Sequence, residues 1–182
     1  MTHRGTQTLL TQRATLRRFT MEDADAMFAN WAGDPEVTRY LLWDAHPDRD
    51  ATREVLRTWV DKYARDAYYN WAIVLGSAPV GNISVVNHDD RDEWAEIGYV
   101  IGRSHWGRGI MTEVLRRVLE YLFREVKMHR VTLRHDVENI GSGRVMLKNG
   151  LVREGVLRKA HRRKDGSWAD MAVYGALREE WG

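Results

Sequence analysis

The fold class that this sequence predicts is α/β (α+β), with a twisted, mixed and mostly antiparallel sheet flanked by helices. Two observations predict it. The spacing of apolar residues switches between the period of two that strands show and the period of about 3.6 that helices show. Along the chain the elements follow the order β-αα-βββ-α-β-α-ββ, so a run of three strands precedes a strand–helix–strand segment. We therefore expect one domain over residues 1–182.

The N-terminal third is expected to hold one strand and two helices. The strand is TLRRF, residues 15–19, and Thr20 with Asp23 can form a variant of the capping box at the start of the first helix. Pro35 ends that helix, because proline cannot continue a hydrogen-bonded turn. The second helix covers residues 51–65, with its apolar side chains on one face.

The central third changes to a period of two and then returns to a helix. Three successive strands are expected at residues 71–75, 80–86 and 95–101, with GSAP and NHDDRDE as the turns between them. From residue 110 to residue 126 apolar side chains recur at helical spacing, which predicts a long amphipathic helix.

The last third is expected to hold a strand, a helix and a strand pair. The strand covers residues 130–136 and the helix residues 139–149, with Gly150 as a left-handed cap at the C-terminal end. The strand pair covers residues 151–160 and 168–177. The segment HRRKDGS between them is expected to be a solvated hairpin loop rather than a nucleic-acid patch.

Composition limits the classes of function. The 182 residues are 43% hydrophobic and 30% charged and include no cysteine, which excludes disulfides, thiolate metal sites and a cysteine nucleophile. The sequence shows no apolar run of membrane-spanning length and no signal-peptide core, so a cytoplasmic protein is expected. The net charge of +2 is uneven: residues 1–100 hold 11 basic and 16 acidic side chains, and residues 101–182 hold 17 and 10. A basic half favours a nucleic acid or a phosphate-rich cofactor, unless the asymmetry is chance.

A glycine pair marks the start of the long helix. The segment SHWGRGIMTEVL, residues 104–115, places Gly107 and Gly109 directly before the first helical turn. That turn has N–H groups without partners and a positive dipole end, and glycines allow a phosphate to approach it. The segment matches neither a Walker loop nor a dinucleotide fingerprint. The alternative is a tight turn that binds nothing.

The wider context resembles a known family. The segments AEIGYVIGRSHWGRGIMTEVLRRVLEYLF, NIGSGRVMLKNGL and REGVLRK, in this order, resemble the GCN5-related N-acetyltransferases (GNAT superfamily). More narrowly, the chain is similar to the branch that includes the ribosomal-protein alanine N-acetyltransferases, and the likeness runs nearly end to end. The resemblance implies acetyl-CoA as the acetyl donor, held where two parallel strands, 95–101 and 130–136, splay apart.

The resemblance also implies a set of cofactor-binding residues. Pantetheine is expected to pair with backbone groups of the first splayed strand, and the pyrophosphate to lie on the amides from His105 to Ile110. Ser104 stands where the family pattern has Gln or Arg, so Arg103 or Arg108 is expected to supply the charge. The full expected set is Tyr99, Val100, Ile101, Arg103, His105, Trp106, Gly107, Arg108, Gly109, Ile110, Met111, Thr112, Asn139 and Ser142.

Acetyl transfer to an amine needs a group that protonates the leaving thiolate. Many family members carry a tyrosine for this, but the matching position here is Met146, which cannot donate a proton. By resemblance Ser142 is the candidate acid, or it orients a donating water; alternatively it only solvates the first helical turn. Asn139 is expected to cap that helix, and by resemblance it also reaches the pantetheine or a water.

The amine must also lose a proton before it attacks. Glu96 is the candidate base, because a carboxylate on a largely apolar strand has a raised pKa if it is desolvated; the alternative is a solvated or salt-bridged Glu96. His135, on the partner strand, is the second candidate. Asp136 and Glu138 are alternatives that would attract a cationic amine.

The sequence therefore predicts an N-acetyltransferase that moves the acetyl group of acetyl-CoA to a primary amine, on a protein N-terminus or a small molecule, by direct attack in a ternary complex. Two alternatives remain: a non-catalytic CoA-binding sensor, and a ribosome- or RNA-associated module on the same scaffold. No metal is expected, because the histidines show no HExxH or similar spacing. Membrane and nucleic-acid partners are not expected, and a homodimer remains open.

Overall fold

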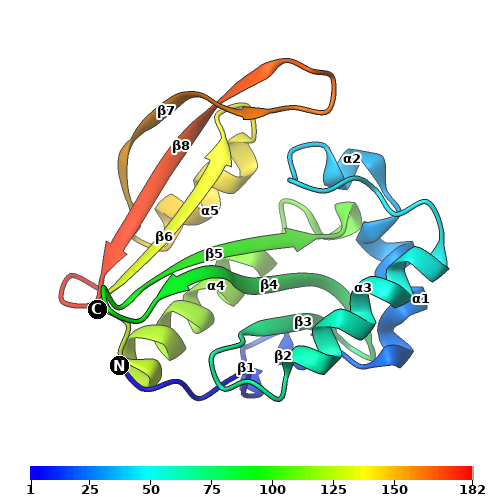
Figure 1. Cartoon of the computed structure of the whole chain (residues 1–182), viewed down its shortest axis with the longest axis horizontal. Coiled ribbons are helices and arrows are strands. Elements are labelled where there is room, and N and C mark those ends of the chain that lie inside the picture. Colours follow the sequence, from blue (N-terminus) through cyan, green and yellow to red (C-terminus); the bar gives the residue numbers. More distant parts are fainter. Residues whose placement is uncertain (182) are drawn as a thin grey trace.

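One eight-stranded sheet forms the frame of the computed structural model, which describes residues 1–181 (Figure 1). The strand order is β1-β2-β3-β4-β5-β6-β8-β7. Every neighbouring pair is antiparallel except β5 with β6, which are parallel, so the predicted mixed and mostly antiparallel sheet is confirmed. The strands are β1 (Leu9–Leu10), β2 (Thr15–Arg17), β3 (Asn70–Leu75), β4 (Ala78–Asp89), β5 (Trp94–Ile101), β6 (Arg130–Asp136), β7 (Val152–Arg162) and β8 (Trp168–Leu177).

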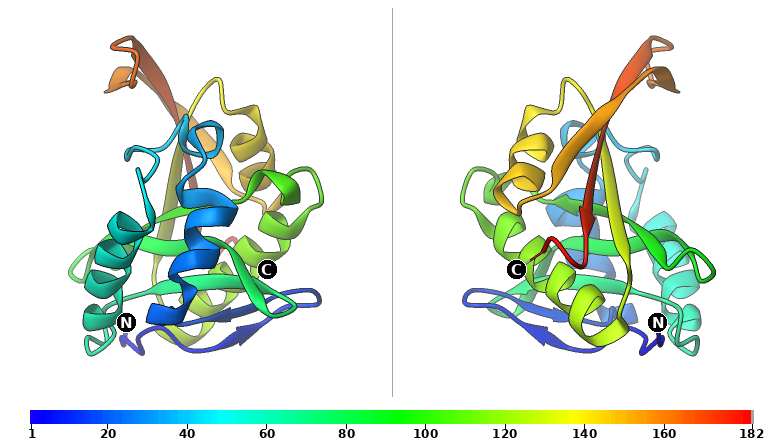
Figure 2. Two further views of the ribbon diagram at one scale, coloured as in Figure 1. Left: turned by 90° about the vertical axis from the view of Figure 1, so that its right-hand side faces the viewer. Right: turned by 90° about the vertical axis from the view of Figure 1, so that its left-hand side faces the viewer.

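Helices cover both faces of this sheet. Figure 2 shows α1 and α3 on one side and α4 and α5 on the other. The helices are α1 (Ala24–Met27), α2 (Pro35–Thr38), α3 (Arg49–Lys62), α4 (Ile110–Tyr121) and α5 (Ile140–Lys148). Two π-helical segments, η2 (Phe28–Ala32) and η4 (Leu122–Val126), extend α1 and α4. Among residues 1–181, no helix has the length and apolar character needed to cross a bilayer.

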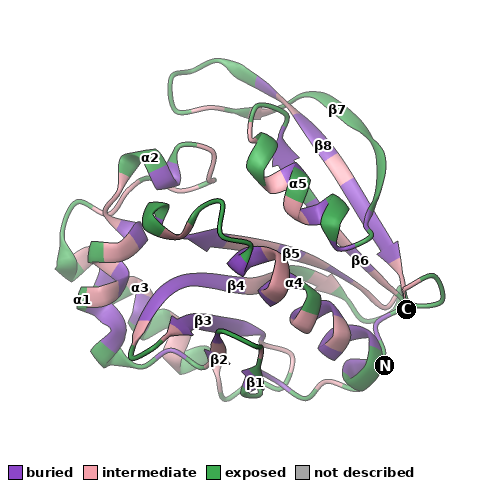
Figure 3. Cartoon of the chain, turned by 180° about the vertical axis from the view of Figure 1, so that it is seen from behind, coloured by how far each residue is buried: buried purple, intermediate pink, exposed green. Residues whose placement is uncertain are grey.

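Each face of the sheet has its own apolar core (Figure 3). Under α4, the side chains of Val114, Leu115 and Val118 are fully buried, as the amphipathic pattern predicts. On the other face Trp31 and Leu56 are fully buried between α1, α3 and the sheet. The sheet is therefore fixed from both sides, which makes it a rigid base for a site.

Local signals in the sequence account for most element boundaries. The backbone N–H of Thr20 donates to Asp23 Oδ2 at 2.8 Å, which confirms the capping contact. Gly150 adopts a φ of 76°, as expected for a left-handed helix cap. Three features differ from the expectation: β1 is an additional strand, α2 is an additional short helix that begins at Pro35, and the predicted long helix ends as the π-helical η4. A two-residue strand is too short to show a period.

The parallel strands β5 and β6 separate soon after they begin. They pair only at Trp94 to Glu96, opposite Arg130 to Thr132, and the rest of β5 stays paired with β4 alone. The register of β4 against β5 shifts by one residue at Val86, beside this point of separation. A bulge bends and twists a strand locally, which helps to turn β5 away from β6. The expected splayed pair is present.

Candidate active site

A cleft of about 570 Å³ opens where β5 and β6 separate. Its walls come from the end of β5, the loop before α4, the first turns of α4 and α5, and the segment around α2. The lining residues are Glu36, Val37, Tyr40, Leu41, Tyr99, Val100, Ile101, His105, Trp106, Gly107, Gly109, Ile110, Met111, Thr112, Glu138, Asn139, Ile140, Gly141, Ser142, Arg144, Val145 and Lys148. Most of the residues expected to bind the cofactor are therefore brought together.

The glycine pair shapes one end of this cleft. Gly107 and Gly109 have φ values of 71° and 74°, a backbone region that costs other residues about 1–2 kcal/mol. Within the described residues, the N–H groups of residues 107–112 have no protein acceptor. Six free donors at the positive end of α4, with no side chain on either glycine, match the requirements of a phosphate group.

The flanking residues differ from the expectation. The N–H groups of His105 and Trp106 already donate to Gly102 O and Arg103 O, at 2.9 and 3.1 Å, so these two amides are not free for a ligand. Arg103 forms an ion pair with Asp34 at 3.1 Å. Neither Arg103 nor Arg108 is among the residues that line the cleft, and the expectation that one of them supplies charge to the cofactor stays a prediction.

Other basic side chains, which the sequence did not indicate as site residues, lie in or beside the cleft. Arg144 and Lys148 line the cleft from α5, where a spacing of four residues places them on the same helix face. Arg13 braces the glycine loop from outside, since its Nη1 donates to Arg108 O at 2.8 Å and its Nε to Glu113 Oε2 at 2.7 Å. The spacing of Arg144 and Lys148 in SGRVMLK could have indicated that they share a helix face, whereas no sequence pattern pointed to Arg13.

Two hydroxyl groups meet where β5 faces α5. Tyr99 Oη lies 2.8 Å from Ser142 Oγ and also donates to Ser142 O at 3.2 Å. Burial raises the pKa of Tyr99 well above its usual value, although the contact with Ser142 opposes this, so the phenol keeps its proton. Asn139 accepts from the N–H of Ser142 at 3.3 Å and caps α5, as expected. Met146 is buried in the core.

Glu96 lies at the last paired position before the strands separate, opposite Thr132. Its Oε1 is 2.7 Å from Arg134 Nε, and only 16% of its side chain is exposed. The carboxylate is therefore ion-paired, which is the salt-bridged arrangement that the sequence left open. It does not line the cleft wall itself.

His135 is covered by α5. Its Nδ1 donates to Asp136 O at 2.7 Å, and within residues 1–181 its buried Nε2 has no hydrogen-bond partner. A Cβ at Gly143 would approach that Nε2 to 2.8 Å, so the helix packs directly on the ring. Burial lowers the pKa of His135, although Asp136 opposes this. The ring, like the carboxylate of Glu96, is outside the cleft lining.

The hairpin between β7 and β8 is mostly exposed to solvent, as expected, but Arg163 and Lys164 anchor it to the rest of the protein. Arg163 Nε binds Asp136 Oδ2 at 2.6 Å and its Nη2 binds Glu138 Oε1 at 2.7 Å. Although burial acts in the opposite direction, the hydrogen bond from Arg163 lowers the pKa of Asp136. One guanidinium thus pairs with two carboxylates, which leaves a net negative charge, and Glu138 lines the cleft with half of its side chain exposed, so attraction of a cationic amine stays a prediction. Lys164 Nζ donates to Thr38 O at 2.8 Å, which ties the hairpin to α2.

The matching family model and three known proteins that resemble this chain are all described as acetyltransferases. A family model described as "Acetyltransferase (GNAT) domain" matches residues 13–152. The chain is 29% identical to the uncharacterized N-acetyltransferase p20 of Bacillus licheniformis, over 96% of this chain and 98% of that protein. It is 30% identical to the ribosomal-protein-serine acetyltransferase of Escherichia coli, over 54% of each. The solved structure of RimL, a ribosomal L7/L12 alpha-N-protein acetyltransferase in complex with coenzyme A, has a TM-score of 0.85 and 19% identity, with 94% of this chain and 98% of that chain covered.

Proposed function

The chain belongs to the GNAT acetyltransferase family and is an acetyl-CoA-dependent N-acetyltransferase, and on this basis we propose that it acetylates a primary amine by direct attack in a ternary complex. The observation that carries the proposal is the splayed β5–β6 pair with the free amides of residues 107–112 at one end. Acetyl-CoA supplies an activated acetyl thioester. The chain lacks cysteine, so no protein thiol is available to carry the acetyl group between donor and acceptor.

The fit to the donor rests on three features of the cleft. The amides of residues 107–112 hold the pyrophosphate, and Arg144 and Lys148 add positive charge from α5. Beyond Glu96 no residue of β6 pairs with β5, so pantetheine can add to the backbone around Tyr99 and Val100 as a strand would, although the carbonyl of Ile101 already accepts from Trp106 Nε1 at 2.8 Å. Each group matches a different part of the donor, which explains why the site needs both an open sheet edge and a helix terminus.

The hydroxyl pair and Glu96 take the proton-transfer roles. Tyr99 and Ser142 donate a hydrogen bond to the thiolate as it leaves, directly or through one water. Glu96 accepts the proton of the amine through water, because it lies where the strands separate. We assign this role to Glu96 rather than His135, whose ring is packed against Gly143.

The acceptor enters from the α2 side of the cleft. Lys164 links the hairpin to the segment around α2, through Thr38 O and through Asp44 Oδ1 at 3.5 Å, and Tyr40 and Leu41 of the same segment line the cleft. We infer that this link narrows the entrance, which favours an amine presented at the end of a chain or on a small molecule. An N-terminal amine, with a pKa of about 8, is partly neutral at physiological pH, which makes a protein N-terminus the favoured class. The two ribosomal-protein acetyltransferases that resemble the chain agree with this class. We propose a cytoplasmic enzyme.

The test is acetyl-CoA turnover, followed by thiol release and by mass spectrometry of the acceptor. The panel contains peptides that begin with Ala, Ser or Met, the same peptides with blocked N-termini, free amino acids, polyamines and aminoglycosides. We expect acetylation of unblocked peptides and intersecting initial-rate lines, whereas parallel lines would indicate a covalent acetyl-enzyme. CoA binding without turnover of any acceptor would favour a non-catalytic sensor.

A further inference from the structure

A group of three possible metal ligands lies away from the cleft. His88 and Asp90 belong to the β4–β5 hairpin, at the start of β5, whereas the cleft lies at its end. His3 comes from the N-terminal segment, which runs beside this hairpin (Figure 1). One ligand atom of each of the three residues lies within 4.8 Å of the other two. The fold thus joins residues that are 85 positions apart in the sequence, which no local spacing predicts.

The distances are close to those of a metal site. Asp90 Oδ1 lies 3.0 Å from His3 Nε2 and 3.0 Å from His88 Nδ1, so a single oxygen faces both rings. A tetrahedral Zn²⁺ with bonds of about 2.0–2.1 Å would hold its ligand atoms about 3.3 Å apart. Small side-chain movements are therefore sufficient to admit an ion.

The orientation of His3 is set by a buried neighbour. His3 Nδ1 lies 2.9 Å from Oη of Tyr69, a fully buried residue that also accepts from the N–H of Arg4 at 3.3 Å. In the tautomer with the proton on Nδ1, His3 donates to Tyr69 and its Nε2 lone pair faces Asp90. Metal-binding histidines commonly have such a partner on the other ring nitrogen.

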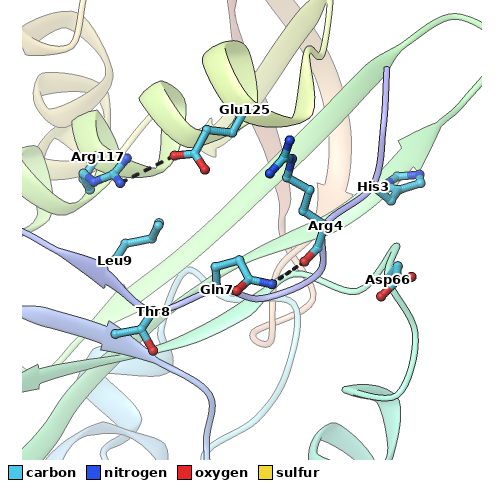
Figure 4. A pocket seen from close by; sticks show the side chains of 8 residues that line it. All are labelled: His3, Arg4, Gln7, Thr8, Leu9, Asp66, Arg117 and Glu125. Atoms are coloured by element: carbon cyan, nitrogen blue, oxygen red, sulfur yellow. Dashed lines mark hydrogen bonds and ion pairs between the residues drawn. The ribbon is translucent and has the colours of Figure 1, made fainter.

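The segment that carries His3 is ordered and open to solvent. The N–H of Gly5 donates to Asp66 O at 2.6 Å, which anchors the segment before any ion binds. His3 and Arg4 extend to opposite sides of it (Figure 4). A surface hollow of about 500 Å³ is lined in part by His3, Arg4 and Asp66, and 60% of the Asp90 side chain is exposed, so the group borders solvent.

We propose that His3 Nε2, His88 Nδ1 and the carboxylate of Asp90 form a binding site for Zn²⁺ or a similar divalent transition-metal ion. Two imidazoles and one carboxylate suit such ions better than Mg²⁺ or Ca²⁺, which prefer oxygen ligands. The bound ion clamps the N-terminal segment to the β4–β5 hairpin. The sequence predicted no metal site, because a ligand spacing is seen only for histidines that lie close together in the chain. His3 lies far from His88 and Asp90 in the sequence.

The test uses the full chain without a polyhistidine tag, treated with a chelator and then titrated with ZnCl₂ in a calorimeter. We expect one Zn²⁺ per chain and a melting temperature that rises with Zn²⁺ concentration. His88→Gln and Asp90→Asn should each weaken binding at least tenfold, as should His3→Gln. The matched control is His129→Gln, an exposed histidine outside the cluster, which should bind Zn²⁺ as the unmodified chain does.

Two results would overturn the proposal. One is the absence of binding at a 1:1 ratio, which would leave the three side chains as a hydrogen-bonded cluster only. The other is Zn²⁺ binding that His88→Gln and Asp90→Asn leave unchanged. Thermal melting of each variant without Zn²⁺ shows that it is folded, so a loss of binding can be attributed to the lost ligand.

Discussion

Tyr99 on β5 and Ser142 on α5 connect two walls of the cleft, because their hydroxyl oxygens lie 2.8 Å apart. We propose that Tyr99 compensates for Met146, the non-donating residue at the position of the family's tyrosine. Burial raises the pKa of Tyr99, so its phenol remains a donor throughout the physiological range. In this proposal the proton-donating group is a pair of hydroxyls from two different elements.

Removing either hydroxyl should slow the chemical step. We expect Tyr99→Phe and Ser142→Ala each to lower kcat by roughly 100-fold, a typical effect for a lost proton donor, with little change in the KM for acetyl-CoA. Because the two groups act as a unit, the double variant should be little slower than either single variant. Steady-state kinetics of the three variants measure this. Fully multiplicative effects would show that the hydroxyls act independently.

The positive φ of Gly109 predicts that replacing this glycine weakens the binding of acetyl-CoA. Gly109→Ala should cost about 1–2 kcal/mol of stability and raise the KM for acetyl-CoA, because a left-handed alanine would shift the free amides. Gly76→Ala is the matched control: Gly76 has a φ of 64° in the β3–β4 turn, where a Cβ meets no atom within 4 Å. The control should lose similar stability in a denaturant titration and keep its KM. Equal changes in KM would count against the glycine loop as the phosphate site.

Glu96 should matter most when the amine is protonated. We expect Glu96→Gln to lower kcat/KM by roughly 100-fold at pH 7, with His135→Gln close to the unmodified rate. The deficit should shrink as the pH rises above about 8, because an N-terminal amine then loses its proton without help. A pH–rate profile on one peptide measures both effects. A Glu96→Gln enzyme with near-normal activity at pH 7 would exclude Glu96 as the base.

His135 should make stability depend on pH. Its pKa in the folded protein lies below the unfolded value of about 6.5, so the folded state binds fewer protons than the unfolded state. Stability is therefore complete above about pH 6.5 and falls as the pH drops through this value toward the folded pKa. Urea titrations between pH 7.5 and 5 should show a smaller loss for His135→Gln than for the unmodified chain. His129→Gln, an exposed control, should leave the slope unchanged.

The sequence allowed the fold to be predicted well, because most elements have a clear period and a local boundary signal. Residues 110–121 carry an apolar stripe after a glycine pair, and the predicted β6 at residues 130–136 has the observed bounds. The glycine loop was also predictable, since it depends on residues adjacent in the chain. β1 escaped prediction because a strand of two residues has no measurable period.

The rest of the site depends on contacts between distant residues. Arg163 binds Asp136 across 27 positions, so the HRRK segment gave no sign that it would be anchored. The contact of Glu96 with Arg134 and the position of His135 under Gly143 both follow from how β6 packs against its neighbours. Spacing along the chain shows which residues share an element, but not which elements meet.

The most direct test of the central claim is an NMR titration of CoA into ¹⁵N-labelled protein. We predict saturable binding with the largest amide shifts at residues 107–112, whose N–H groups have no acceptor among the described residues, and at Tyr99, Val100 and Ile101. Residues of the β4–β5 hairpin, such as Asp90, should not shift. Absence of binding, or shifts that avoid residues 107–112, would contradict the account.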